Sequence, residues 1–164
     1  MDERLTEFAR QTQKRNASES ALAGLIFVLF VFELITGPDT LLAGLGYLIG
    51  AVAAVIVVAV LWGLLAVNPA EVTRQPPAEF AQEWQSRLTR QARILRMAWL
   101  WYVLPLDAGV VLIILGHTGV DMFLRTGLAI IAVLGGIWVA RVHIRTAESV
   151  ERLRDNLAQS ASRE

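Results

Sequence analysis

The sequence LLAGLGYLIGAVAAVIVVAVLWGLLAV, residues 41–67, decides the fold of this chain, because it contains no charged side chain. A helix that crosses the hydrocarbon core of a bilayer, roughly 30 Å thick, needs about 20 predominantly apolar residues. Three further apolar stretches cover residues 20–36, 97–115 and 122–140. We therefore predict an all-α integral membrane protein with four membrane helices.

The composition limits what else the chain contains. Of its 164 residues 55% are hydrophobic, and the segments 1–19, 68–96 and 141–164 are too short to build separate soluble domains. We therefore expect a single membrane domain. The formal net charge of zero argues against a nucleic-acid partner, and the absence of cysteine excludes thiolate chemistry. Because no nucleotide, metalloprotease or serine-hydrolase motif is present, we expect no enzymatic activity, no metal and no cofactor.

The distribution of positive charge predicts the topology. Lysine and arginine gather in the three polar segments, whereas the short connections at residues 37–40 and 116–121 contain neither. Positive residues remain on the cytoplasmic side of a membrane. We therefore expect a membrane protein whose two termini and middle segment are cytoplasmic, and whose two helical hairpins turn outside.

The two predicted hairpins resemble each other weakly in sequence. The tripeptide RLT at residues 4–6 recurs at residues 87–89, and the turn TGPD at 36–39 recurs as TGVD at 118–121. In each turn the glycine can adopt a positive φ and the aspartate can cap the following helix. Both hairpins start on the same side, so we expect a four-helix bundle of two parallel-repeat hairpins with cytoplasmic helical extensions.

Small residues repeat every four positions in the second and fourth membrane helices. Such ladders let helix backbones approach closely in lipid. We predict that these two helices pack through the ladders, within one chain or between the copies of a homo-oligomer. The alternative is chance, because glycine and alanine are common in membrane helices. The ladder residues are Gly46, Gly50, Ala54, Ala132, Gly136 and Ala140.

Three ionisable residues fall inside the apolar stretches, where charge is costly and often functional. Glu33 and Arg125 lie close to the outer turns, so both side chains can reach water. Asp107 is the exception, because it lies near the middle of the third membrane helix.

Asp107 also lies beside a predicted helix defect. Pro105 lacks the backbone N–H of an ordinary residue and should kink the helix near Trp101, and Gly109 loosens the same region. One interpretation is structural: Asp107 binds a backbone donor freed by the kink, or pairs with Arg125. The other is functional: Asp107 handles a proton or a cation.

The cytoplasmic segments are predicted to be helical. From residue 78 apolar side chains recur at helical spacing on one side of a helix, and arginines occupy another. This basic face can bind phosphates of the lipid bilayer or dock a cytoplasmic protein. Residues 1–18 are expected to form a frayed interfacial helix, and Val150, Leu153 and Leu157 a short seam that supports a dimer. The basic face consists of Arg87, Arg90, Arg93 and Arg96.

Residues 85–116 resemble a family of small, uncharacterised bacterial membrane proteins with four helices. The pattern RQ…LR..W.WY.LP…G of that family is matched by Arg90-Gln91, Leu95-Arg96, Trp99, Trp101-Tyr102, Leu104-Pro105 and Gly109. The chain departs from the pattern at Asp107, where an apolar residue is expected, and at Ala108, where a second proline is expected.

The resemblance implies a hairpin, a cytoplasmic linker, a polar helix that runs into the third membrane helix, and a charged tail. It implies no catalytic residues. Family members are often encoded near sigma factors of the extracytoplasmic-function type, which implies a regulatory role by association. We therefore expect a regulatory or scaffold anchor for a cytoplasmic partner such as a sigma factor. The alternatives are a small dimeric transporter or channel that uses Asp107, and a purely structural membrane protein.

Overall fold

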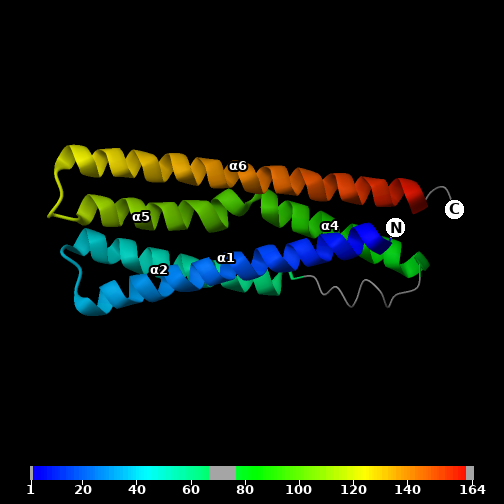
Figure 1. Cartoon of the computed structure of the whole chain (residues 1–164), viewed down its shortest axis with the longest axis horizontal. Coiled ribbons are helices and arrows are strands. Elements are labelled where there is room, and N and C mark those ends of the chain that lie inside the picture. The colour runs from blue at the N-terminus through cyan, green and yellow to red at the C-terminus, as the bar shows by residue number, and fades with distance from the viewer. Residues whose placement is uncertain (1, 67–76, 162–164) are drawn as a thin grey trace.

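The computed structural model describes residues 2–66 and 77–161, and in these ranges all regular secondary structure is helical. Two antiparallel hairpins, α1–α2 and α5–α6, lie side by side with both turns at one end and both chain termini at the other (Figure 1). The elements in chain order are α1 (Asp2–Thr36), α2 (Leu41–Gly63), α4 (Pro77–Arg96), the π-helix η1 (Trp99–Val103), α5 (Leu104–Gly116) and α6 (Met122–Ala161).

Four helices are long and apolar enough to cross a membrane, which confirms this part of the prediction from composition. Two boundaries differ from those expected. The helix α2 ends at Gly63 rather than at residue 67, and the final residue of the expected span lies outside the described residues. Residues 2–18 do not form a separate interfacial helix, because α1 is continuous from Asp2 to Thr36. The four candidate spans are Thr6–Thr36, Leu41–Gly63, Trp99–Gly116 and Met122–Asn156.

The helices pack in the order α1, α2, α5 and α6, so that α5 separates α2 from α6 (Figure 1). The contact between α2 and α5 is made by glycine. A Cβ on Gly46 would lie 2.6 Å from the carbonyl oxygen of Gly109, and a Cβ on Gly109 would lie 2.9 Å from the carbonyl oxygen of Gly46. Side chains at these positions would force the two backbones apart. The close approach therefore requires both glycines.

The predicted pairing of the two small-residue ladders does not occur within the chain. The helices α2 and α6 are not among the described helix pairs that pack on one another. Gly46 meets α5, a side chain at Gly50 would overlap the ring of Phe30 in α1, and Gly136 meets Asp107 in α5. The reason is steric, because α5 also carries glycines and occupies the face of α2 that α6 was expected to fill. Pairing of ladders between two copies stays a prediction.

The two hairpin turns differ in how they start the next helix. Gly37 adopts a φ of 101°, as the turn requires, but Asp39 does not cap α2. Thr40 is the cap: its hydroxyl accepts a hydrogen bond from the backbone N–H of Ala43 at 3.1 Å and donates one to the carbonyl oxygen of Gly116 at 2.8 Å. This hydroxyl therefore links the two hairpins at the end that carries the turns.

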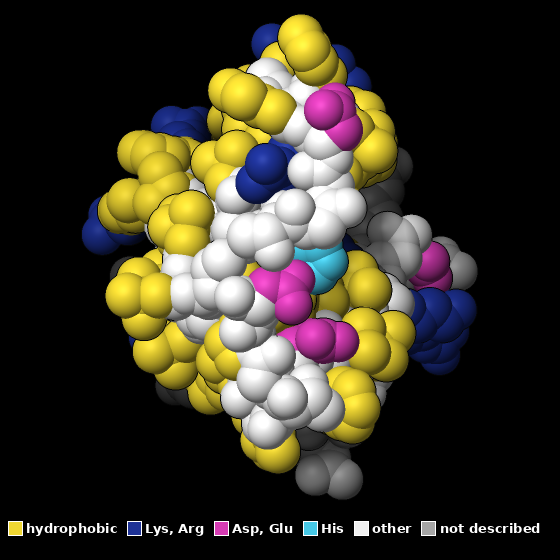
Figure 2. Space-filling view, turned by 90° about the vertical axis from the view of Figure 1, so that its left-hand side faces the viewer, with side chains coloured by type: hydrophobic (Ala, Val, Ile, Leu, Met, Phe, Trp, Pro, Cys, Tyr) yellow, Lys and Arg dark blue, Asp and Glu magenta, His cyan; other side chains and the backbone are white. Residues whose placement is uncertain are grey.

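In the second turn the expected cap does form. The carboxylate of Asp121 accepts a hydrogen bond from the backbone N–H of Phe123 at 3.0 Å. Asp39 instead lies 3.1 Å from Nδ1 of His117. Figure 2 looks onto this end of the molecule and shows a histidine next to acidic side chains near its centre.

The other half of the molecule has its own core, in which α4 packs against α6. Trp84, Leu88 and Leu95 of α4 are almost completely buried, together with Ala147 and Val150 of α6. From Trp84 onward, the apolar side of α4 is thus covered by the chain itself.

The expected dimer seam is part of the same core. Val150 is buried and Leu153 packs beside it, because α6 presents this side to α4. Val150 is therefore not available to a second copy of the chain, whereas Leu153 is only partly buried. The side chain of Leu157 lies outside the described residues.

We predict that Gly46→Ala lowers the free energy of unfolding by about 1–3 kcal/mol, the usual cost of overfilling a packed interface. The added methyl group would meet the backbone of α5, which has no rotamer to adopt. Thermal unfolding in detergent measures the effect. The control is Gly24→Ala, which adds the same group where nothing lies within 4 Å and should be neutral or slightly stabilising. Equal stability of both variants would contradict the proposed role of the glycine contact.

Candidate functional site

A groove lies between the α5 and α6 helices and extends along η1. Its volume is about 370 Å³, and Asp107 is its one ionisable lining residue. Val103 and Val111 line the α5 side, and Gly136 and Ile137 line the α6 side. The groove is therefore an apolar surface with a single carboxylate.

Gly136 makes room for this carboxylate. A Cβ at Gly136 would lie 2.6 Å from Oδ2 of Asp107 and 3.2 Å from a methyl group of Val103. Any larger residue would push against the carboxylate. Within the chain, Gly136 and Ala140 of the α6 ladder therefore line this groove.

The helix defect predicted at Pro105 lies directly before this site. The chain forms a π-helix over Trp99–Val103, and the backbone N–H of Leu104 donates to the carbonyl oxygen of Trp99, five residues earlier. Pro105 has no N–H with which to continue the α-helical ladder, so a wider turn fits at this position. The π-helix contributes Trp99 and Val103 to the groove.

The three ionisable residues of the apolar stretches are not brought together. Arg125 does not pair with Asp107, because its Nη1 donates to the carbonyl oxygen of Leu115 at 3.2 Å, near the outer end. Glu33 is exposed on α1 close to the first turn. Within the described part of the chain, Asp107 has neither an ion pair nor a hydrogen bond. The expected structural role for Asp107 therefore lacks its partner.

A second polar site was not predicted. It lies on α1 just before its apolar stretch, where Asn16 is only 1% exposed. The Nδ2 of Asn16 donates to the carbonyl oxygens of Leu61, at 2.9 Å, and Leu65, at 3.3 Å. These are carbonyls at the end of α2, where a helix lacks its own donors. Asn16 thereby holds the end of α2 against α1.

Charged neighbours surround this asparagine. Nε of Arg15 lies 3.7 Å from Oε1 of Glu19, and both side chains are mostly buried. Three atoms of this cluster are buried without a hydrogen-bond partner: Nε of Arg15, Oδ1 of Asn16 and Oε2 of Glu19. Buried polar groups are normally satisfied, so such atoms mark a place for bound water or a ligand.

We call Arg15, Asn16 and Glu19 the inner polar cluster. Aromatic side chains lie beside it. His143 of α6 is 7% exposed, and its ring contacts that of Tyr102 edge-on with centroids 5.1 Å apart. Tyr102 stacks on Trp101, whose Nε1 donates to the carbonyl oxygen of Ile94 at 3.0 Å. Arg15 lies within electrostatic reach of His143.

The sequence does contain a signal for this cluster. Positions 9, 12, 16 and 23 are all buried and follow the three- and four-residue spacing of one helix face. Two of them, Thr12 and Asn16, are polar. The signal is weak because this face becomes continuous only when residues 1–18 belong to the same helix as the apolar stretch that follows.

The basic face of α4 is divided by ion pairs. Arg96 forms two hydrogen bonds of 2.8 Å to the carboxylate of Glu151 in α6. Arg87 pairs with Glu83, one turn earlier on α4, at 2.8 Å. Arg90 and Arg93 are exposed and form no ion pair with a described residue. Only part of the predicted face is therefore open to a partner.

Comparisons with known proteins add no family assignment. No protein-family model, no curated protein and no solved structure matches the chain. The resemblance to the family of small bacterial membrane proteins therefore stays a prediction.

We predict that Asn16→Leu lowers the free energy of unfolding by about 1–3 kcal/mol, because two buried carbonyl groups of α2 lose their donor. Chemical denaturation in detergent measures the change. Gln11→Leu on the same helix is the matched control, since Gln11 is exposed and bonds only to Glu7. If both variants were equally stable, Asn16 would not hold the α1–α2 contact.

Proposed function

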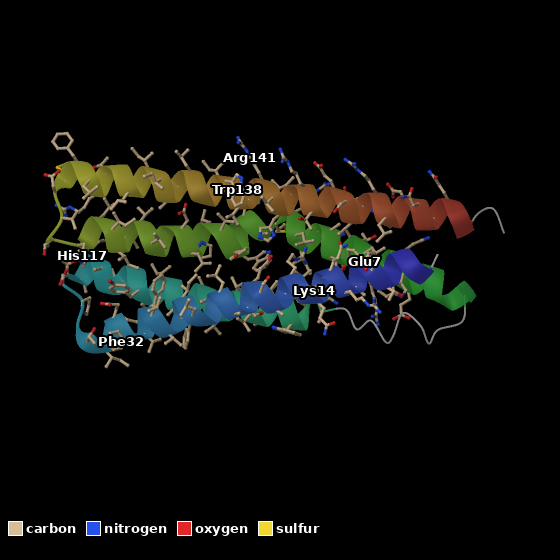
Figure 3. The ribbon with its side chains drawn as sticks, viewed as in Figure 1. Glu7, Lys14, Phe32, His117, Trp138 and Arg141 are labelled. Carbon is tan, nitrogen blue, oxygen red and sulfur yellow. The ribbon has the colours of Figure 1, made fainter. Side chains whose placement is uncertain are left out.

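We propose that the chain is a non-enzymatic anchor in a bacterial inner membrane that binds a cytoplasmic protein. The termini and α4 lie in the cytoplasm and the two hairpin turns lie outside. The charge distribution supports this orientation, since the turns contain no lysine or arginine. In Figure 3 the labelled residues Lys14 and Arg141 lie away from the turn end, which carries His117.

The observation that carries the proposal is the packing of α4. This helix is held against α6 by a buried core and by the ion pair between Arg96 and Glu151. Membrane insertion does not require such a bundle outside the apolar stretches. Its effect is to hold Arg90 and Arg93 on a rigid exposed surface.

The chemistry of this surface suits an acidic partner. Arginine binds carboxylates through paired N–H donors, and exposed charges at an interface steer association and fix orientation. The resemblance described for residues 85–116 favours a sigma factor as the partner, by association only. A second copy of the chain and anionic lipid are the competing occupants.

We predict that the double variant Arg90→Gln/Arg93→Gln loses about tenfold in cross-linking to its cytoplasmic partner, equivalent to about 1.4 kcal/mol of binding free energy. In-cell photo-cross-linking from Ser86, an exposed position on α4, followed by mass spectrometry measures this. The matched control is Arg10→Gln/Lys14→Gln, which removes the same charge from the exposed side of α1.

The proposal fails if the cross-linked partner is captured equally by both double variants. It also fails if only lipid and copies of the chain are captured. In either case α4 would not be a docking helix.

A second candidate function is that of a small dimeric transporter or channel. The observation that favours it is the unpartnered carboxylate of Asp107 in an open groove. We predict that Asp107→Asn abolishes proton or monovalent-cation flux into proteoliposomes while the helical content is unchanged. Glu33→Gln, which neutralises an exposed carboxylate near the outer turn, should leave the flux intact. Wild-type flux in the Asp107 variant would remove this candidate.

A further inference from the structure

We propose that the groove between α5 and α6 is a binding site for a lipophilic cation, with Asp107 as its counter-ion. This inference rests on the membrane placement proposed above. It names the class of ligand that would bind in the groove, which is also the groove of the transport candidate. Binding does not require transport, so the two can be tested separately.

The size and lining of the groove fit a small organic ligand. Its volume of about 370 Å³ lies within the range of ligand pockets, roughly 300–1,000 Å³. Such pockets are mostly apolar and contain a few polar groups that orient the ligand. Here Val133 and Ile137 supply the apolar wall, and Asp107 supplies the polar group.

The charge of the site selects a cation. A carboxylate in apolar surroundings is costly unless it is paired with an opposite charge. Among the described residues none supplies that charge to Asp107, whose carboxylate lies against the backbone of Gly136. An anionic ligand would be repelled, and a neutral one would leave the carboxylate unpaired. A positively charged ligand satisfies the site.

The lining also excludes hydrated divalent cations. Calcium takes six to eight oxygen ligands and magnesium requires an octahedral set. The groove offers one carboxylate among side chains of valine, leucine, isoleucine and alanine. A cation whose charge is carried by an apolar body, such as a quaternary ammonium or phosphonium ion, does not need an oxygen shell. Trp99 lines the groove as well, and indole rings attract such cations.

The groove is accessible from the side of the bundle. Leu104, Val133 and Ile137 border it, and each is more than two-fifths exposed, at 53%, 43% and 44% respectively. In the proposed orientation this side faces the bilayer. Lipophilic cations partition into membranes, so the ligand can enter laterally from the lipid.

The experiment is equilibrium binding of radiolabelled tetraphenylphosphonium to the purified full-length chain in detergent. We expect saturable binding that Asp107→Asn weakens at least tenfold and that Asp107→Glu retains within a few-fold. Gly136→Ala should also weaken binding, because the added methyl group displaces the carboxylate. Glu33→Gln is the matched control for loss of a carboxylate and should bind as the wild type does.

Two further measurements keep the proposal falsifiable if the Asp107 variants do not fold. Tetraphenylborate, which has the same shape and the opposite charge, should not compete for the site. Tetraphenylphosphonium binding by the wild-type chain should fall as the pH is lowered, because protonation removes the counter-ion.

Absence of saturable binding, or equal binding by the wild type and Asp107→Asn, would overturn the proposal. Cross-linked dimers that depend on Asp107, in a chain that binds no phosphonium ion, would overturn it in favour of a second copy as the occupant. A failure of the chain to bind tetraphenylphosphonium would not count against the proposed anchoring function. Binding without flux would remove only the transport candidate.

Discussion

The arrangement of the helices depends on the backbone contact between α2 and α5. In a bilayer, apolar side chains gain little by leaving lipid for one another, so close approach and hydrogen bonds decide which helices associate. Gly46 and Gly109 supply the close approach. Thr40 supplies the hydrogen bond, through its donation to Gly116. Because α5 fills this face of α2, α6 packs on the far side of α5, and the groove that contains Asp107 forms there.

The π-helix connects the two candidate sites of the molecule. Trp99 and Val103 line the groove, whereas Tyr102 stacks on Trp101 and contacts His143 beside the inner polar cluster. Residues of this one wide turn thus reach both places. Wide turns of this kind are frequent at functional sites. Pro105 gives the physical reason for the wide turn at this position.

The all-helical class and the four long apolar helices were predictable, because apolar stretches of membrane length that contain at most one charged residue have few other uses. Which helix packs against which was not predictable. Small residues occur in α2, α5 and α6 alike, and only the shape of the assembled bundle assigns Gly46 to Gly109. Similarly, the apolar side of α4 is visible in the sequence, but its burial against Val150 depends on the register of two distant helices.

The isolation of Asp107 is the strongest reason to look outside the chain for its partner. A structural carboxylate lies against a donor, yet Asp107 forms no hydrogen bond with a described residue. Nη1 of Arg125 binds the carbonyl oxygen of Leu115, and Nε1 of Trp101 binds that of Ile94. Gly136 has no side chain to cover the carboxylate that lies against it. A carboxylate in apolar surroundings without an internal partner must be neutralised by a proton, by water or by a ligand. The apolar walls of the groove offer water few partners, which leaves a proton and a cation to compete for the same carboxylate.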